Sequence, residues 1–314
     1  MRTSLARLLA SIGLLVSIGL LAAIGATAAR AQTAHSLDQV PPLLKTPEAK
    51  NFYAEQMAGK PAPDGLGVHL PTGLSAQQVT ALMPPAAGAK LNVVGAKSLP
   101  GQADRYVAVV CTGGDIPTGP DDTPCTRALG DDAAPPLQVT LGVIEMKPGA
   151  APALVARPAQ IDGKVNWKDT ALPAAPQALD DAADGRIAPD GYEGFDLAPY
   201  RIAADQTAFG LRGVWTESYS GGGANYSALY LFAVVDGAVK QILAVPMSAF
   251  QDIAGDWHKD GTRDHQIIDA ANLLVVTPHS TAGHFDLLLK ARAGHGQRTY
   301  RWSTTTGSYQ PAAK

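Results

Sequence analysis

Short apolar runs recur through most of the chain beyond residue 100, which is the pattern of successive β-strands. Runs rich in Val, Leu, Ile, Phe and Tyr are separated by short segments of Gly, Pro, Asp and Asn. The strands predicted from these runs span 106–111, 137–146, 153–157, 208–218, 226–235, 238–246, 273–277, 285–292 and 297–303. Because successive runs are joined by short turns, we expect a mostly β fold, either an antiparallel meander or a sandwich.

Local signals add three elements to this pattern. Asp236-Gly237 lies between two strand-like runs and predicts a tight hairpin. Ser75 has the character of a helix N-cap and predicts a short helix near 75–83, which Pro84-Pro85 ends. A second short helix is expected over 47–57.

Composition divides the chain into five segments. These are a signal peptide over 1–31, a Pro/Gly-rich arm over 32–74, a first β unit over 75–170, a linker over 171–195 and a C-terminal β unit over 196–314. Both β units show the order strand, loop, strand, turn, strand. Two similar, duplicated units would explain this order, and so would generic hairpin patterning.

The first 31 residues have the features of an export signal. Arg2 and Arg7 precede an apolar run over 8–24, and Ala29-Arg30-Ala31 offers a small-x-small cleavage site. This pattern predicts a signal helix and a periplasmic or secreted protein. An uncleaved anchor is the alternative, because the run is close to the shortest length that spans a bilayer. No later segment is apolar for long enough, so we expect no stable membrane span after cleavage.

Charge narrows the class of partner. Removal of residues 1–31 takes away three arginines and no acidic residue, so the net charge changes from −3 to −6. No run of Lys or Arg occurs in the chain. Nucleic acid and anionic membranes are therefore not expected as partners.

The chain contains two cysteines, Cys111 and Cys125. In an oxidising compartment, an even and closely spaced pair predicts a disulfide. The spacing is far wider than the two intervening residues of redox-active pairs, which favours a structural role.

A polar segment over 256–265 is the first candidate for chemistry. Asp256, His258 and Asp260 alternate before Gly261, and Asp264 and His265 follow. Spaced oxygen ligands before a glycine resemble a calcium loop, but His258 is a poor calcium ligand and no glutamate holds the twelfth position. A mixed imidazole and carboxylate site for a divalent transition metal is the other functional interpretation. A polar surface loop without a ligand is the alternative.

Histidine is concentrated in the same part of the chain. Five of the seven histidines lie between residues 258 and 295, at His258, His265, His279, His284 and His295. Adjacent strands could bring three of them together around zinc, although their spacing matches no known ligand signature. No cofactor is expected apart from such a divalent metal.

A second candidate is the glycine-rich segment between two predicted strands. Gly221, Gly222 and Gly223 would let the backbone approach a ligand, and the flanking Tyr219 and Tyr226 would stack on a sugar or ring. A plain connection between two strands is the alternative.

Common catalytic signatures do not occur in the sequence. It contains no Gly-x-Ser-x-Gly, Ser-x-x-Lys, His-Glu-x-x-His or Cys-x-x-Cys motif. The sequence therefore predicts a non-catalytic exported protein that binds an envelope protein or a glycan. The alternative is an envelope hydrolase or metal-dependent enzyme that uses the His/Asp cluster over 256–295.

Overall fold

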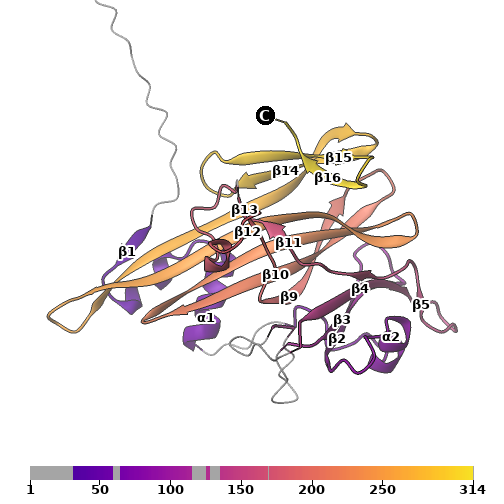
Figure 1. The fold of residues 1–314 in the computed structure, drawn as a ribbon, viewed down its shortest axis with the longest axis horizontal. Helices are drawn as coiled ribbons and strands as arrows, with labels where there is room; N and C mark the ends of the chain where they lie inside the picture. The colour runs from indigo at the N-terminus through magenta and orange to yellow at the C-terminus, as the bar shows by residue number, and fades with distance from the viewer. Residues whose placement is uncertain (1–30, 59–63, 115–124, 128–134, 169, 314) are drawn as a thin grey trace, which may run out of the picture.

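Eight consecutive strands form one antiparallel meander in the computed structural model of the protein (Figure 1). The structure describes residues 31–58, 64–114, 125–127, 135–168 and 170–313. Within them, β1 joins the meander by pairing with β13, and the expected mostly β, antiparallel fold is confirmed. The strands of this large sheet are β1 (Gln32–Ala34), β9 (Gly191–Arg201), β10 (Thr207–Tyr219), β11 (Gly222–Val235), β12 (Ala238–Trp257), β13 (Arg263–Thr281), β14 (His284–Ala291), β15 (Gln297–Ser303) and β16 (Ser308–Pro311).

A smaller antiparallel sheet and a few short elements make up the rest of the described fold. The smaller sheet contains β2 (Leu91–Ser98), β3 (Arg105–Thr112), β4 (Gln138–Glu145), β5 (Ala153–Leu154) and β6 (Ala159–Gln160). The remaining elements are the paired strands β7 (Val165–Asn166) and β8 (Arg186–Ile187), the helices α1 (Pro47–Ala58) and α2 (Ala76–Leu82), and the 3-10 turns η1 (Leu37–Gln39), η2 (Pro41–Leu43) and η3 (Gln177–Leu179).

Strand β11 lies at the centre of the fold because both of its faces are apolar. Tyr226 and Tyr230 point to the face that the smaller sheet covers, and Leu229 and Leu231 point to the opposite face. All four side chains are fully buried. Successive residues of a strand face opposite sides, so a strand buried on both faces requires a layer on each side.

The smaller sheet forms one of these layers. Its inward side chains, such as Val109 and Leu141, share a core with Trp215 of β10 and with Trp167. The rings of Trp167 and Trp215 meet edge to face at 5.2 Å between centroids. The two expected β units therefore contribute to one hydrophobic core, although strands β9 to β12 are longer than β2 to β4.

Strand β13 changes partners halfway along its length and thereby makes the other layer. Residues 263–271 pair with β12, and residues 272–281 pair with β14. At this point Asn272 donates from Nδ2 to the Pro246 carbonyl at 3.0 Å. Strands β14 to β16 then cover the second face of β11 and β12 with Leu287, Trp302 and Tyr309.

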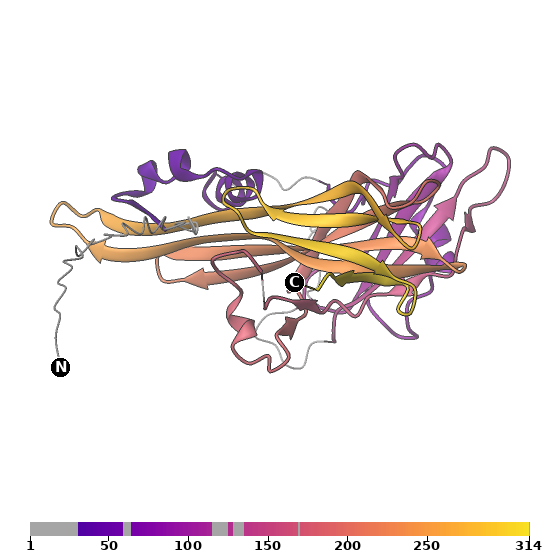
Figure 2. The same cartoon turned by 90° about the horizontal axis from the view of Figure 1, so that it is seen from above.

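The N-terminal arm lies against the far half of the β12–β13 hairpin. Figures 1 and 2 show the arm and the smaller sheet toward opposite ends of the long strands. Val40, Leu44 and Ala49 of the arm pack on Phe250 and Ile267 of the hairpin. The expected arm over 32–74 thus contains an ordered docking segment over its described residues 32–54.

Local sequence signals agree with the structure at the predicted helix and turn. Ser75 caps α2 through a reciprocal capping box with Gln78, as its N-cap prediction requires. Asp236 and Gly237 both have positive φ, 50° and 69°, and form the two-residue turn between β11 and β12. The expected linker over 171–195 already contains the start of β9 at Gly191.

The predicted signal segment lies almost wholly outside the described residues, since residues 1–30 are not described. Among the described residues, no helix combines the length and the apolar character needed to cross a bilayer. Export and cleavage therefore remain predictions from the sequence.

Candidate functional site

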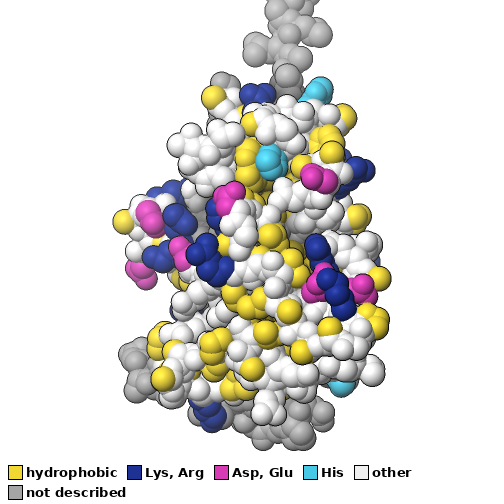
Figure 3. Space-filling view, turned by 90° about the vertical axis from the view of Figure 1, so that its right-hand side faces the viewer, with side chains coloured by type: hydrophobic (Ala, Val, Ile, Leu, Met, Phe, Trp, Pro, Cys, Tyr) yellow, Lys and Arg dark blue, Asp and Glu magenta, His cyan; other side chains and the backbone are white. Residues whose placement is uncertain are grey.

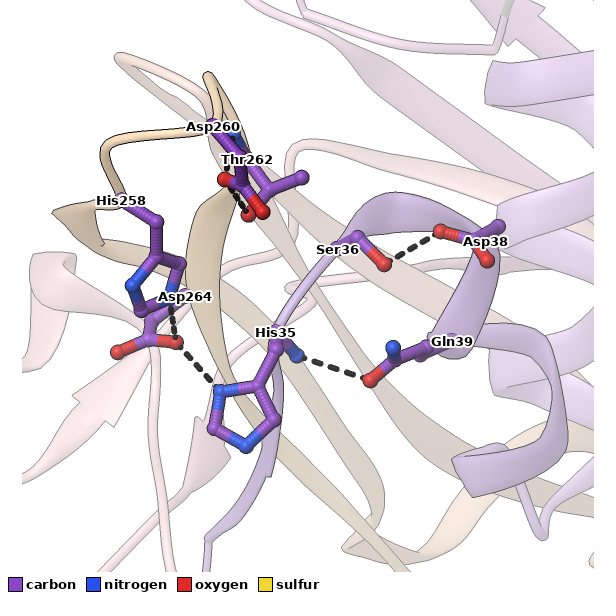
Figure 4. A network of polar contacts seen from close by, with 8 residues as sticks. All are labelled: His35, Ser36, Asp38, Gln39, His258, Asp260, Thr262 and Asp264. Carbon is purple, nitrogen blue, oxygen red and sulfur yellow. Dashed lines mark hydrogen bonds and ion pairs between the residues drawn. The ribbon is translucent and has the colours of Figure 1, made fainter.

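Two imidazoles and one carboxylate meet at the tip of the β12–β13 hairpin (Figure 4). Asp264 Oδ1 lies 2.9 Å from His35 Nδ1 and 2.7 Å from His258 Nε2. One ligand-type atom from each residue lies within 4.8 Å of the other two. Hydrogen bonds with His258 and His35 hold the pKa of Asp264 below its ordinary value. The carboxylate therefore stays ionised between the two rings.

Strand pairing and a tight turn bring these three residues together. Ala34 of β1 pairs with His265 of β13, so the next arm residue, His35, lies beside Asp264. His258 begins the turn, in which its N–H donates to the Thr262 carbonyl at 2.8 Å. The turn thus brings the ring of His258 into contact with the carboxylate of Asp264 at the start of β13.

Only two of the five predicted metal ligands belong to this cluster. His258 and Asp264 meet, whereas Asp256 is exposed and has no described contact with them. Asp260 accepts hydrogen bonds from the Thr262 N–H and hydroxyl, at 3.0 and 2.8 Å. Of the five predicted residues, the structure therefore brings only His258 and Asp264 together.

His265 is separated from the cluster by the alternation of side chains along β13. Because it follows Asp264 directly, its ring points to the opposite face. There its Nδ1 lies 2.7 Å from Asp252 Oδ1, with the two side chains only 5% and 11% exposed. Burial raises the pKa of Asp252 in spite of the neighbouring imidazole. Ala34 of β1 is the strand partner of His265, so this buried pair lies beside the arm.

The other histidines of the predicted cluster lie in separate places. His279 is exposed on the part of β13 that pairs with β14. His284 stacks on Trp302 with ring centroids 3.8 Å apart, and His295 lines a cavity of about 440 Å³ next to the arm. The histidines over 258–295 therefore do not form one site.

The predicted glycine and tyrosine site becomes a tight hairpin with a buried aromatic residue. Gly221 has φ of 87° in the two-residue turn between β10 and β11, and Gly222 and Gly223 already belong to β11. Tyr226 is fully buried and accepts a hydrogen bond from Gln251 Nε2 at 2.6 Å. Tyr219 donates to Glu217. Because Tyr226 is buried, its ring offers no exposed face on which a sugar could stack.

The predicted disulfide between Cys111 and Cys125 is present, with 5.8 Å between the Cα atoms. Both residues are buried in the core that the two sheets share. The carbonyl of Cys125 accepts the N–H of Tyr192 at 2.9 Å, at the start of β9. The bond therefore links β3 of the smaller sheet to the edge of the large one.

A polar cavity of about 500 Å³ opens between the β7–β8 pair and the outer layer. Four cationic side chains line it, at Lys164, Lys168, Arg186 and Arg298. Residues with side-chain amides and two tyrosines also line it, at Asn166, Gln241, Asn272, Gln297, Tyr300, Tyr309 and Gln310. No carboxylate lines it among the described residues, and Asp169, which follows Lys168 in the sequence, is not described.

Sequence reasoning missed both His35 and this cavity. His35 stands 229 positions before Asp264, and no local spacing links the two residues. The cavity is lined by residues of β7, β8 and β12 to β16, and the change of partner along β13 brings the last of these strands over β12. No signal within a single segment would have identified either feature.

Two surfaces therefore have the chemistry to bind something. One is the polar cavity with cationic side chains, and the other is the exposed cluster of two imidazoles around a carboxylate. The chain matches no model of a known protein family, no curated protein and no solved structure.

Proposed function

We propose that this protein is an exported, non-catalytic binding protein whose polar cavity holds an anionic carbohydrate. The observation that carries the proposal is the set of cationic and amide side chains lining a cavity of about 500 Å³. Small-molecule sites generally have volumes of roughly 300–1000 Å³. The cavity is therefore large enough for a short oligosaccharide segment.

Charge at the cavity favours an anion. Lys164, Lys168 and Arg186 are exposed, and none of them forms a described ion pair. Lys168 donates from Nζ to the Ala183 carbonyl at 2.9 Å, which orients its side chain and leaves its charge without a counterion among the described residues. In a chain of net charge −3, such a local group of cations favours carboxylate, sulfate or phosphate groups on the ligand.

The amide side chains favour a ligand with hydroxyl groups. Gln241 and Gln297 each offer a donor and an acceptor at the wall of the cavity. Sugar hydroxyls also donate and accept, so amides complement them better than cations alone would. Cations and amides together indicate a uronate or another acidic sugar more than a simple inorganic anion.

Binding is favoured over hydrolysis by the residues that are absent from the described cavity wall. Neither a carboxylate nor an imidazole lines it among the described residues, so a general acid–base pair is not found there. The His–Asp cluster contributes no residue to the cavity. The hydrolase alternative therefore has less support than binding.

One observation supports export, and another favours a small anionic ligand over nucleic acid. The disulfide is typical of proteins from oxidising compartments, which agrees with the predicted signal. On the face in Figure 3, Lys and Arg side chains lie in small groups, several of them beside Asp or Glu, and form no continuous basic band. Long polyanions such as nucleic acid need a broader basic surface.

Isothermal titration with oligogalacturonate and with a neutral oligogalactose of equal length tests the proposal. We expect the acidic sugar to bind, with an affinity that falls as salt is added, and the neutral sugar to bind at least about tenfold more weakly. Lys168→Glu and Arg186→Glu should each weaken binding by about tenfold. Lys90→Glu is the matched control, because Lys90 is exposed and lines neither cavity.

Three results would contradict the proposal. They are no binding of either sugar, equal binding of both sugars, and equal losses in the Lys90→Glu control and the cavity variants.

A further inference from the structure

We propose that His35, His258 and Asp264 bind one divalent transition metal ion of the zinc type, which fastens the N-terminal arm to the β12–β13 hairpin. The three ligands come from two segments that are far apart in sequence, with 229 positions between His35 and Asp264. The cluster contributes no residue to the cation-lined cavity, so this site is independent of the proposed carbohydrate site.

The types of ligand fit this class of ion. Two imidazoles and one carboxylate are a common protein ligand set for zinc and its neighbours, and catalytic zinc sites add a water molecule as the fourth ligand. Calcium and magnesium prefer sites built from oxygen atoms alone. The two imidazoles therefore select a transition metal.

The geometry needs only small adjustments. With metal–ligand bonds of about 2.0–2.1 Å, ligand atoms of a tetrahedral site lie about 3.3 Å apart. The carboxylate oxygen of Asp264 already lies 2.9 and 2.7 Å from the two ring nitrogens. The two ring nitrogens also lie within 4.8 Å of each other, so side-chain rotations that move the ligand atoms by about 1 Å would arrange the group around an ion.

The backbone around the cluster holds the ligands in place. His35 N–H donates to Gln39 Oε1 at 3.2 Å, which fixes the arm where it leaves β1 (Figure 4). The turn after His258 is closed by hydrogen bonds from Thr262 to Asp260, and Gly261 adopts a φ of 84°. A site held by a strand pair and a closed turn loses little conformational freedom when the metal binds.

The site is accessible from solvent, and the nearby Arg263 side chain is turned away from it. The side chains of His35 and His258 are 68% and 38% exposed, so an ion and its water ligand reach them from solvent. Arg263 precedes Asp264 on the strand and therefore points to the other face. There its guanidinium lies 5.2 Å from the Trp257 ring and donates to the Gly255 carbonyl.

Zinc titration of the full chain without a histidine tag tests the site. We expect one Zn²⁺ per chain by calorimetry, and loss of this binding in His35→Ala and in His258→Ala. His279→Ala is the matched control, because His279 is exposed on the distant half of β13 and should leave the stoichiometry unchanged. His258 lies in an exposed turn, so its variant keeps the core intact.

Two further measurements separate a built site from loose binding. Trp257 is 69% exposed and next to His258, whereas the other three tryptophans are buried. Cu²⁺ should therefore quench the exposed tryptophan emission in the wild type and much less in His258→Ala. Zn²⁺ should also slow hydrogen exchange over 32–54 in the wild type but not in His35→Ala.

Specific results would overturn the proposal. They are the absence of Zn²⁺ binding by the wild type, binding that survives both His35→Ala and His258→Ala, an equal loss in His279→Ala, and binding without any protection of the arm. If the protein did not bind carbohydrate, the results for zinc binding, tryptophan quenching and hydrogen exchange would be unchanged. The two proposals can therefore be tested independently.

Discussion

Thr46 and Asp269 join the N-terminal arm to strand β13 across 223 positions of sequence. The Thr46 hydroxyl donates to Asp269 Oδ1 at 2.6 Å, and the Thr46 N–H donates to Oδ2 at 2.9 Å. The same hydroxyl oxygen accepts the N–H of Ala49 at 3.1 Å in the first turn of α1. One carboxylate therefore positions the residue that caps the helix of the arm.

Asp269→Ala should release this end of the arm. It removes the acceptor for the N–H groups of Lys45 and Thr46 and for the Thr46 hydroxyl, with an expected loss of about 2 kcal/mol in the free energy of unfolding. Urea denaturation measures the loss, and limited proteolysis should show faster cleavage within 32–54. Asp256→Ala, at an exposed site of the same hairpin, should change neither quantity. Unchanged cleavage in Asp269→Ala would contradict this role.

Reduction of the Cys111–Cys125 disulfide should lower stability by about 3 kcal/mol, the value expected for closing a loop of this length. Thermal unfolding with and without a reductant measures the effect. Because both cysteines are buried in the shared core, the double variant to alanine also loses the packing of two sulfur atoms and should be at least as unstable as the reduced protein. Equal melting temperatures for the oxidised and reduced protein would show that the bond adds no stability.

Tyr230→Phe tests a buried hydrogen bond between the two halves of the chain. The Tyr230 hydroxyl donates to the Gly163 carbonyl at 2.6 Å, and the tyrosine is fully buried. Removal of the hydroxyl leaves the buried Gly163 carbonyl without this donor. We therefore expect the free energy of unfolding, measured with denaturant, to fall by about 1–2 kcal/mol. Tyr106→Phe removes a hydroxyl that makes no described hydrogen bond and should cost less. A larger loss in the Tyr106 variant would refute the assignment.

Asp64 should make stability depend on pH in the acidic range. Burial raises its pKa, but hydrogen bonds from the His69 side chain and from the N–H groups of Val68, His69 and Gly67 outweigh burial and lower it overall. A folded pKa below the unfolded value, about 3.9, gives stability that is present above pH 4 and lost as the pH falls through the folded pKa. The carboxylate shapes a loop whose Gly67 carbonyl accepts the N–H of Ala96 on β2 at 2.9 Å.

The variant Asp64→Asn checks this pH dependence. The difference in unfolding free energy between wild type and variant should be largest near pH 7 and should shrink below pH 4. Asp181→Asn, at an exposed position, is the control and should show no such pH dependence. A difference that stays constant from pH 7 to pH 3 would exclude the ionised carboxylate as its source.

Local chemistry made some elements predictable. The N-cap at Ser75 and the turn at Asp236-Gly237 each depend on residues within a few positions, so they were predicted correctly. Apolar runs between turn residues likewise identified most of β10, β11 and β14. The sequence also predicted the disulfide, because only one pairing of two cysteines exists.

Long-range pairing made the rest unpredictable. The polar stretch over 256–265 looks like a loop, but half of it is the end of β12 and the start of β13, and only residues 258–262 form the turn between them. Its polar residues are compatible with strands because this part of the hairpin projects toward solvent. His35 lies beside His258 and Asp264 because of the register in which β1 pairs with β13, and no local sequence pattern predicts that register.

The distance in sequence between the arm and its docking surface also sets the order of folding. Contacts that close more than 200 residues of chain have a high entropic cost and form slowly, so they come after the hairpins have formed. We expect residues 32–54 to remain unattached until β12 and β13 have paired. We therefore expect the segment that precedes every other described element to reach its native position last and to leave it first on unfolding.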